Sequence, residues 1–148
     1  MKDSRVGSYG VLALILVIAA RIMALASLPA TAQSLILLIS LAMVSRLMMV
    51  VYLNWLPSAR AEGLGHQAGK DSGPSVVVAA SLCVPVMLYS GVFILFSLVA
   101  LCGAAVIIGW IANRQIGGQT GDVCGAVQIL SETVGWLCLT ALFTSVSV

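Results

Sequence analysis

The chain has 148 residues, of which 61% are hydrophobic and only 8% are charged, and its formal net charge is +2. Soluble domains are about 45–50% apolar and about 25% charged. This composition therefore excludes a disordered chain, a secreted disulfide scaffold and an ordinary cytosolic enzyme. The small net charge, without a basic run, argues against nucleic-acid binding. An integral membrane protein remains, and its length predicts a single membrane domain over residues 1–148.

Long apolar stretches predict an all-α, polytopic membrane bundle of about five helices, because a transmembrane helix needs about 20 apolar residues. Pro29 ends the first stretch. Residues 75–112 contain no charge, but as one helix they would span about 57 Å, against a hydrocarbon core of about 30 Å. We therefore predict two helices with a turn near Tyr89–Gly91. The predicted helices occupy about residues 11–28, 33–53, 75–90, 92–112 and 122–142.

Five crossings place three polar segments, residues 1–10, 54–74 and 113–121, on one side of the membrane. The loop cations all fall on that side: Lys2, Arg5, Arg60, Lys70 and Arg114. By the positive-inside rule this side is cytoplasmic. We expect the inner (cytoplasmic) membrane of a bacterium or archaeon, with any functional site facing the cytoplasm.

Two of these polar segments combine a carboxylate with glycine-rich backbone, namely residues 3–7 (DSRVG) and 117–122 (GGQTGD). Such backbone can approach a phosphate closely and present its N–H groups to it. Carboxylates beside phosphates are the usual setting for Mg²⁺, and arginine and lysine side chains can hold the remaining phosphate charge. The alternative is a set of solvated loops without a ligand, and composition alone does not separate the two interpretations.

Three charged residues, Arg21, Arg46 and Glu132, fall within apolar stretches. A charge at the bilayer centre costs about 2.5–3.5 kcal/mol on the insertion scale, so such residues usually face the bundle interior and pair. We expect Glu132 to pair with one of the two arginines. Arg21 is interpreted as structural, whereas Arg46, nearer the cytoplasmic end, could also reach an anionic ligand by snorkelling. Glu132 either forms the floor of a polar cavity or holds the bundle together.

Other polar and aromatic residues have less specific interpretations. Tyr52, Trp55 and Trp110 fall near predicted cytoplasmic helix ends, as interfacial anchors do. Trp136 lies inside the last helix and is interpreted as a packing residue. His66, the sole histidine, is interpreted as a solvated loop residue rather than a general base.

Three segments taken in order resemble one family: residues 1–10 (MKDSRVGSYG), 59–65 (ARAEGLG) and 117–126 (GGQTGDVCGA). They are similar to the cobalamin synthase family, also called adenosylcobinamide-GDP ribazoletransferase. Glu132 sits where that family tends to carry a glutamate in its last helix. Family members typically begin with further membrane helices and a segment of the type D-G-L-A-D-x-x-D-G, which these residues do not contain. The resemblance therefore implies that the chain corresponds to a C-terminal portion.

The resemblance implies a reaction. α-Ribazole, or its 5′-phosphate, is transferred onto adenosylcobinamide-GDP with Mg²⁺ as cofactor, which releases GMP and forms adenosylcobalamin or its 5′-phosphate, the last steps of cobalamin (vitamin B12) biosynthesis. The diphosphate requires neutralisation by cations, and the attacking hydroxyl requires a base.

The resemblance and the loop chemistry together give each site residue an expected role. Asp3 and Asp122 are expected to bind the metal, and Glu62 and Asp122 to act in catalysis. The expected phosphate-binding residues are Ser4, Arg5, Gly7, Arg60, Lys70, Gly118, Thr120, Gly121 and Gly125. Arg21, Arg46 and Glu132 are the intramembrane polar residues.

The expected partners are the two substrates, the lipid bilayer, and either a second copy of the chain or a missing N-terminal part supplied as a separate chain. No nucleic acid is expected. Two alternatives remain open from the residues. In a small transporter subunit, Arg21, Arg46 and Glu132 would line a pathway. In a truncated, non-catalytic fragment or scaffold, the missing aspartate-rich segment would account for the lack of activity.

Overall fold

The computed structural model describes residues 7–55, 73–89, 93–118 and 120–146, and all the regular structure in these ranges is helical. The helices are α1 (Ser8–Ser27), α2 (Ala32–Trp55), α4 (Gly73–Tyr89), α5 (Phe93–Ile116) and α6 (Gly121–Val146). The predicted all-α fold is confirmed. The largest departures from the predicted bounds are at the C-terminal ends of α5 and α6, which each continue four residues further, to Ile116 and Val146.

Four of these helices, α1, α2, α5 and α6, are long and apolar enough to cross a membrane. Helix α4 has 17 residues, with Pro85 inside it, and its apolar part runs from Val76 to Pro85. At 1.5 Å per residue α4 measures about 26 Å, slightly less than the hydrocarbon core of about 30 Å. The structure thus describes a polytopic membrane bundle of four full-length apolar helices and one shorter helix.

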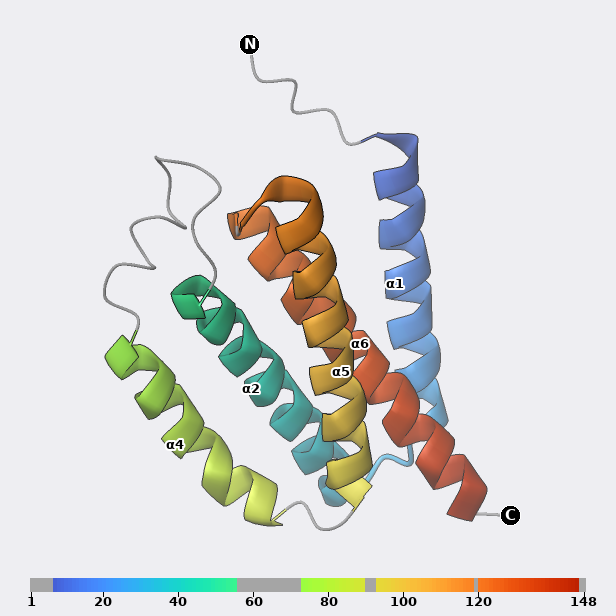
Figure 1. The fold of residues 1–148 in the computed structure, drawn as a ribbon. Helices are drawn as coiled ribbons and strands as arrows, with labels where there is room; N and C mark the ends of the chain where they lie inside the picture. The colour runs from blue at the N-terminus through green and yellow to red at the C-terminus, as the bar shows by residue number, and fades with distance from the viewer. Residues whose placement is uncertain (1–6, 56–72, 90–92, 119, 147–148) are drawn as a thin grey trace.

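The helices run alternately up and down (Figure 1). Helices α1, α4 and α6 begin at one end of the bundle, where α2 and α5 finish. We call this end the polar end, because it carries Arg114 in the last turn of α5 and Asp122 in the first turn of α6. The helix ends that border the three polar segments thus lie at one end of the bundle, as the predicted alternation of crossings requires, whereas residues 1–6 and 56–72 lie outside the described residues.

Helix α6 lies at the centre of the packing, against α5, α2 and α1. The main core cluster combines leucines of three helices: Leu37, Leu41, Leu98, Leu101 and Leu139. Small hydroxyl residues are also fully buried in the bundle: Ser40, Ser45, Ser97 and Ser131. Small residues let membrane helices approach closely, whereas the large side chains on the outer faces remain exposed, as contact with lipid requires.

A close contact joins α2 to α5 near the polar end. The Tyr52 hydroxyl donates a hydrogen bond to the Ala105 carbonyl at 2.8 Å. A Cβ placed at Gly109 would lie 2.1 Å from Tyr52 Cε1, so the ring occupies the space that the glycine leaves. Tyr52 was expected as an interfacial anchor near a helix end. In the structure it also packs between α2 and α5, because Gly109 provides room for its ring.

We predict that Gly109→Ala destabilises the protein relative to Gly103→Ala. Both substitutions gain the same helix propensity, but a Cβ at Gly103 meets nothing within 4 Å. The Gly109 variant must displace Tyr52 and break its hydrogen bond, at a cost of about 1–3 kcal/mol. Denaturant unfolding in detergent micelles, followed by circular dichroism, measures the difference. Equal stability of the two variants would contradict the close contact.

Candidate functional site

The turn between α5 and α6 is built on glycine. Gly117 has a φ of +75°, a left-handed conformation that glycine adopts without a steric penalty. Its N–H donates to the Asn113 carbonyl at 3.0 Å, which closes the last turn of α5. Gly118 is buried directly after it. Glycines at these positions let the chain reverse between two transmembrane helices within a few residues.

The first turn of α6 is capped and accessible. The Thr120 hydroxyl oxygen accepts a hydrogen bond from the Val123 N–H at 3.3 Å, so Thr120 caps the helix. Asp122 is exposed in this first turn, where the helix dipole favours a negative charge. A Cβ at Gly121 or Gly125 would meet nothing within 4 Å. This side of α6 is therefore open to a ligand or to another chain.

The remaining predicted loop residues are only partly described. Gly7 precedes α1 in extended backbone, and its carbonyl accepts the Val11 N–H at 3.1 Å. The start of α1, which Gly7 precedes, lies at the polar end (Figure 1). The other predicted site residues lie outside the described residues: Asp3, Ser4, Arg5, Arg60, Glu62 and Lys70. Their expected roles stay predictions.

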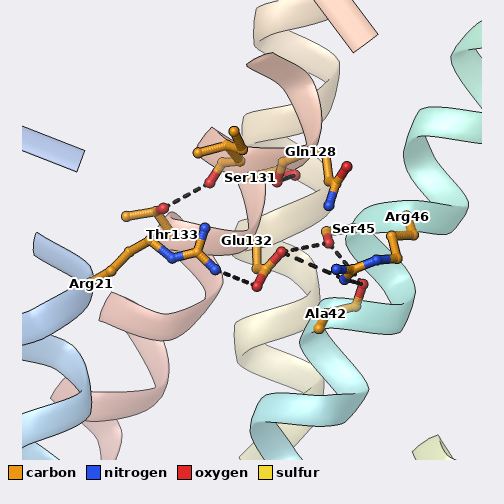
Figure 2. A network of polar contacts seen from close by, with 9 residues as sticks. Arg21, Ala42, Ser45, Arg46, Gln128, Ser131, Glu132 and Thr133 are labelled. Carbon is orange, nitrogen blue, oxygen red and sulfur yellow. Dashed lines mark hydrogen bonds and ion pairs between the residues drawn. The ribbon is translucent and has the colours of Figure 1, made fainter. Parts of the chain in front are cut away.

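The intramembrane charges form one cluster in the structure (Figure 2). Arg21 Nη2 of α1 donates to Glu132 Oε1 of α6 at 2.5 Å. Arg46 Nη1 of α2 lies 4.0 Å from Glu132 Oε2. The predicted pairing of Glu132 with an arginine is confirmed, and Arg21 makes the closer of the two contacts. The Glu132 side chain is only 5% exposed, whereas that of Arg46 is 59% exposed.

Backbone and side-chain groups of α2 complete the cluster. Ser45 Oγ lies 3.0 Å from Glu132 Oε2 and 2.9 Å from the Ala42 carbonyl oxygen, so its single proton serves one acceptor at a time. Arg46 Nη1 donates to the same carbonyl at 2.8 Å. The Arg46 guanidinium thus lies beside Glu132, one turn back along α2. This differs from the expectation that Arg46 extends by snorkelling toward the polar end.

Two contacts of the cluster, made by Trp136 and Ser45, were not predicted from the sequence. The Arg21 guanidinium carbon lies 4.3 Å from the centre of the Trp136 ring, a cation–π contact. Trp136 also packs against the main core cluster, as predicted. The sequence could have indicated that Trp136 lies near the cluster, because positions 132 and 136 share a helix face. No comparable signal identified Ser45, because serines are spread throughout the apolar stretches.

The cluster and the polar end are separate in space. Glu132 follows Asp122 by ten residues of the same helix, which corresponds to about 15 Å. A ligand held at Asp122 is therefore too far away to exchange a proton directly with Glu132, because direct transfer needs about 2.6–3.2 Å. The cluster fixes α1 and α2 on α6, and the polar end holds the groups that suit an anionic ligand.

These features define a polytopic membrane protein with an internal ion pair and an accessible, glycine-rich polar end. Comparison with known families supplies the assignment. Residues 1–140 match the family described as cobalamin-5-phosphate synthase, and the chain belongs to that family.

Curated relatives carry the name adenosylcobinamide-GDP ribazoletransferase. The protein of Sinorhizobium medicae is 39% identical over 89% of this chain and 54% of its own length. Those of Bradyrhizobium diazoefficiens and Allorhizobium ampelinum are 37% and 36% identical, over 90% and 89% of this chain and 52% and 54% of their own lengths. The chain thus spans about half the length of the curated relatives it matches. No solved structure matches it.

The family assignment confirms the resemblance carried by the three glycine-rich segments. It does not favour the alternatives of a transporter subunit or a non-catalytic scaffold. The geometry adds a reason against an ion pathway through the cluster. Arg21 and Glu132 are bonded to each other, and the Glu132 carboxylate is closed off from its surroundings.

We predict that Glu132→Gln destabilises the bundle by up to about 3 kcal/mol, because it leaves the partly buried Arg21, 26% exposed, without a counter-charge within the membrane. Arg46→Gln should lower the free energy of unfolding of the isolated chain by only about 0–1 kcal/mol, since the contact between Arg46 and Glu132 is long and the Arg46 side chain is largely exposed. Denaturant unfolding in micelles measures both changes. Arg21→Met combined with Glu132→Gln should recover much of the loss, since an apolar replacement for a buried pair is often neutral. Equal effects of Glu132→Gln and Arg46→Gln would refute the assigned order of the two contacts.

Proposed function

We propose that this chain contributes the phosphate- and metal-binding end of a membrane enzyme that transfers α-ribazole, or its 5′-phosphate, onto adenosylcobinamide-GDP. The observation that carries the proposal is the match of residues 1–140 to the cobalamin-5-phosphate synthase family, together with relatives named adenosylcobinamide-GDP ribazoletransferase. The product is adenosylcobalamin or its 5′-phosphate, and the leaving group is GMP.

The geometry of the polar end supports this proposal. The open first turn of α6 presents Asp122 beside Gly121, and the start of α1 lies at the same end of the bundle (Figure 1). Glycine backbone permits close approach of a diphosphate, and a helix N-terminus favours negative charge. Thr120 keeps its hydroxyl proton available to a phosphate oxygen, because the oxygen accepts the capping bond.

The transfer is a substitution at phosphorus. A ribazole hydroxyl attacks the phosphorus nearest the corrin, and the bond from that phosphorus to the bridging oxygen of the diphosphate breaks. GMP leaves with the bonding electron pair, and the hydroxyl proton passes to a base. Glu62 and Asp122 are the candidates for that base. Ser4, Arg5, Arg60 and Lys70 would hold the phosphate oxygens, because charge on those oxygens must be neutralised.

The donor set fits Mg²⁺ as far as the structure describes it. Asp122 offers exposed carboxylate oxygens, and Mg²⁺ is usually held by one or two carboxylates together with substrate phosphates and water. Within the described residues no three metal-ligating side chains gather, which suits a metal that arrives with its diphosphate. Asp3 is the second proposed ligand. The bound metal would supply charge neutralisation at the diphosphate.

We place the polar end at the cytoplasmic face of the inner membrane. The loop cations are concentrated in the three polar segments, and cytoplasmic loops carry such an excess of lysine and arginine. This orientation also gives the site access to nucleotide-bearing substrates from the cytoplasm.

An assay of GMP release tests the activity. Purified chain in detergent receives adenosylcobinamide-GDP, α-ribazole and Mg²⁺, alone and co-expressed with the part of the Sinorhizobium medicae relative that it does not match. We expect GMP and cobalamin in equal amounts in the co-expressed sample, because the chain spans only about half of that relative. Omission of α-ribazole is the control for simple hydrolysis. Absence of product from a sample in which both polypeptides are present and folded would contradict the proposed function.

In an active preparation, Asp122→Asn should reduce GMP release by about 10²–10³-fold, the scale seen when one group that stabilises developing charge is lost. It should also raise the Mg²⁺ concentration required for half-maximal rate, since an amide is a weaker ligand than a carboxylate. Asp3→Asn should behave in the same way. Asp71→Asn, which changes a loop carboxylate without a proposed role, is the matched control. Unchanged Mg²⁺ dependence in both variants would overturn the metal assignment.

A further inference from the structure

One face of α6 is open over its first half. Gly121, Gly125, Gln128 and Glu132 follow one another at intervals of three and four residues, so they share a face. The opposite face, with Val123 and Val127, packs against α5. Toward the polar end this face has open space, since a Cβ at Gly121 or Gly125 would contact nothing within 4 Å, although Gly125 and Gln128 are themselves partly buried. The face ends at the charge cluster around Glu132 (Figure 2).

Helix α1 leaves this face uncovered. Every residue from 7 to 16 is exposed, and this stretch covers more than two helical turns, so none of its faces is buried against the described residues. The first half of α1 stands apart from the other helices in Figure 1. The helix reaches α6 only further along, where Ala24 is buried and Arg21 bonds to Glu132.

The charge beside this face is unbalanced. Two arginines share one carboxylate, and Glu132 is occupied most closely by Arg21 at 2.5 Å, whereas Arg46 remains 4.0 Å away and 59% exposed. The other described carboxylate, Asp122, lies about 15 Å along α6 from Glu132. Arg46 itself lies nine residues, or about 14 Å, before the end of α2 at Trp55. An exposed cation at this depth in a bilayer calls for an anionic partner.

We propose that the face of α6 formed by Gly125 and Gln128, one turn beyond the first turn that carries Asp122, is a docking surface for a transmembrane helix from outside these 148 residues. That helix carries an aspartate or glutamate at mid-membrane depth, which pairs with Arg46. A glycine at position 125 allows the close backbone approach that packs membrane helices, and Arg46 supplies the complementary charge. The relatives are about twice as long as the part that this chain matches, so further chain is available in the family. The inference goes beyond the proposed reaction and rests on none of its steps.

Two other occupants fit less well. A second copy of this chain would bring only Glu132 to that depth among its described residues, and that carboxylate is already bonded and 5% exposed. A lipid phosphate belongs at the membrane surface, about 15 Å from the centre of the core, whereas Arg46 is directed back toward Ala42. A carboxylate on a neighbouring helix satisfies both depth and charge.

Co-purification tests the docking surface without any measurement of activity. The probe is the tagged part of the Sinorhizobium medicae relative that this chain does not match, co-expressed with the chain and captured in mild detergent. We expect the wild-type chain to be retained, and Gly125→Leu to reduce retention by about tenfold or more. Gly103→Leu is the matched control, because a Cβ at Gly103 also contacts nothing within 4 Å but lies on α5. Circular dichroism of each isolated variant shows whether it has folded.

The charge is tested with Arg46→Glu, which should also lose retention by about tenfold or more. Arg114→Glu is its control, since Arg114 lies over Trp110 near the end of α5. Each membrane carboxylate of the probe is then changed to Lys in turn, and one such change should restore retention of the Arg46→Glu chain. No retention of wild type, full retention of folded Gly125→Leu and Arg46→Glu variants, or equal loss in the controls would each overturn the proposal. None of these outcomes depends on GMP release, so failure of the docking proposal can be distinguished from failure of the proposed function.

Discussion

The burial of one carboxylate in the bilayer governs how the bundle is assembled. A carboxylate in hydrocarbon requires polar or charged partners, and the structure surrounds Glu132 with Arg21 at 2.5 Å and Ser45 at 3.0 Å. These contacts draw α1 and α2 onto α6 from two sides. Apolar packing alone would not fix the rotation of these helices, because leucine contacts with lipid are nearly as favourable as leucine contacts with protein. The ion pair therefore selects one arrangement among many that bury similar apolar area.

This constraint separates two tasks along the length of α6. Its middle holds the bundle together through Glu132, and its first turn presents an exposed Asp122 and open glycines at the polar end. Rigidity in the membrane and open backbone at the surface are both useful to an enzyme that handles a diphosphate, since groups that stabilise developing charge must be held in place beforehand. The polar end is where we propose that such chemistry occurs.

Much of this could be predicted from the sequence, for identifiable reasons. The helices follow from apolar runs measured against bilayer thickness, and the pairing of Glu132 follows from its being the single carboxylate within those runs. The end of α5 was placed too early, because Asn113 and Arg114 continue the helix although they are polar. The end of α6 was also placed too early, because the polar Thr144 and Ser145 continue that helix. Which arginine pairs closely depends on helix rotation, and the place of Tyr52 depends on space left by Gly109. The local sequence pattern predicts neither the closer arginine partner of Glu132 nor the position of Tyr52. The loop residues Asp3, Arg60 and Glu62 lie outside the described residues, so their roles stay predictions.

The contact between Arg21 and Glu132 spans 111 positions of the chain and joins the first described helix to the last. During synthesis α1 enters the membrane before α6 exists, and Arg21 must then lie in hydrocarbon or at its edge without a carboxylate, at a cost of about 2.5–3.5 kcal/mol if it reaches the centre. Helix α1 has enough apolar length to insert regardless. The apolar length of α1 thus keeps the nascent protein in the bilayer at first. The ion pair between Arg21 and Glu132 can form only after α6 has been inserted. A chain interrupted before α6 would therefore keep Arg21 in the membrane without its carboxylate partner.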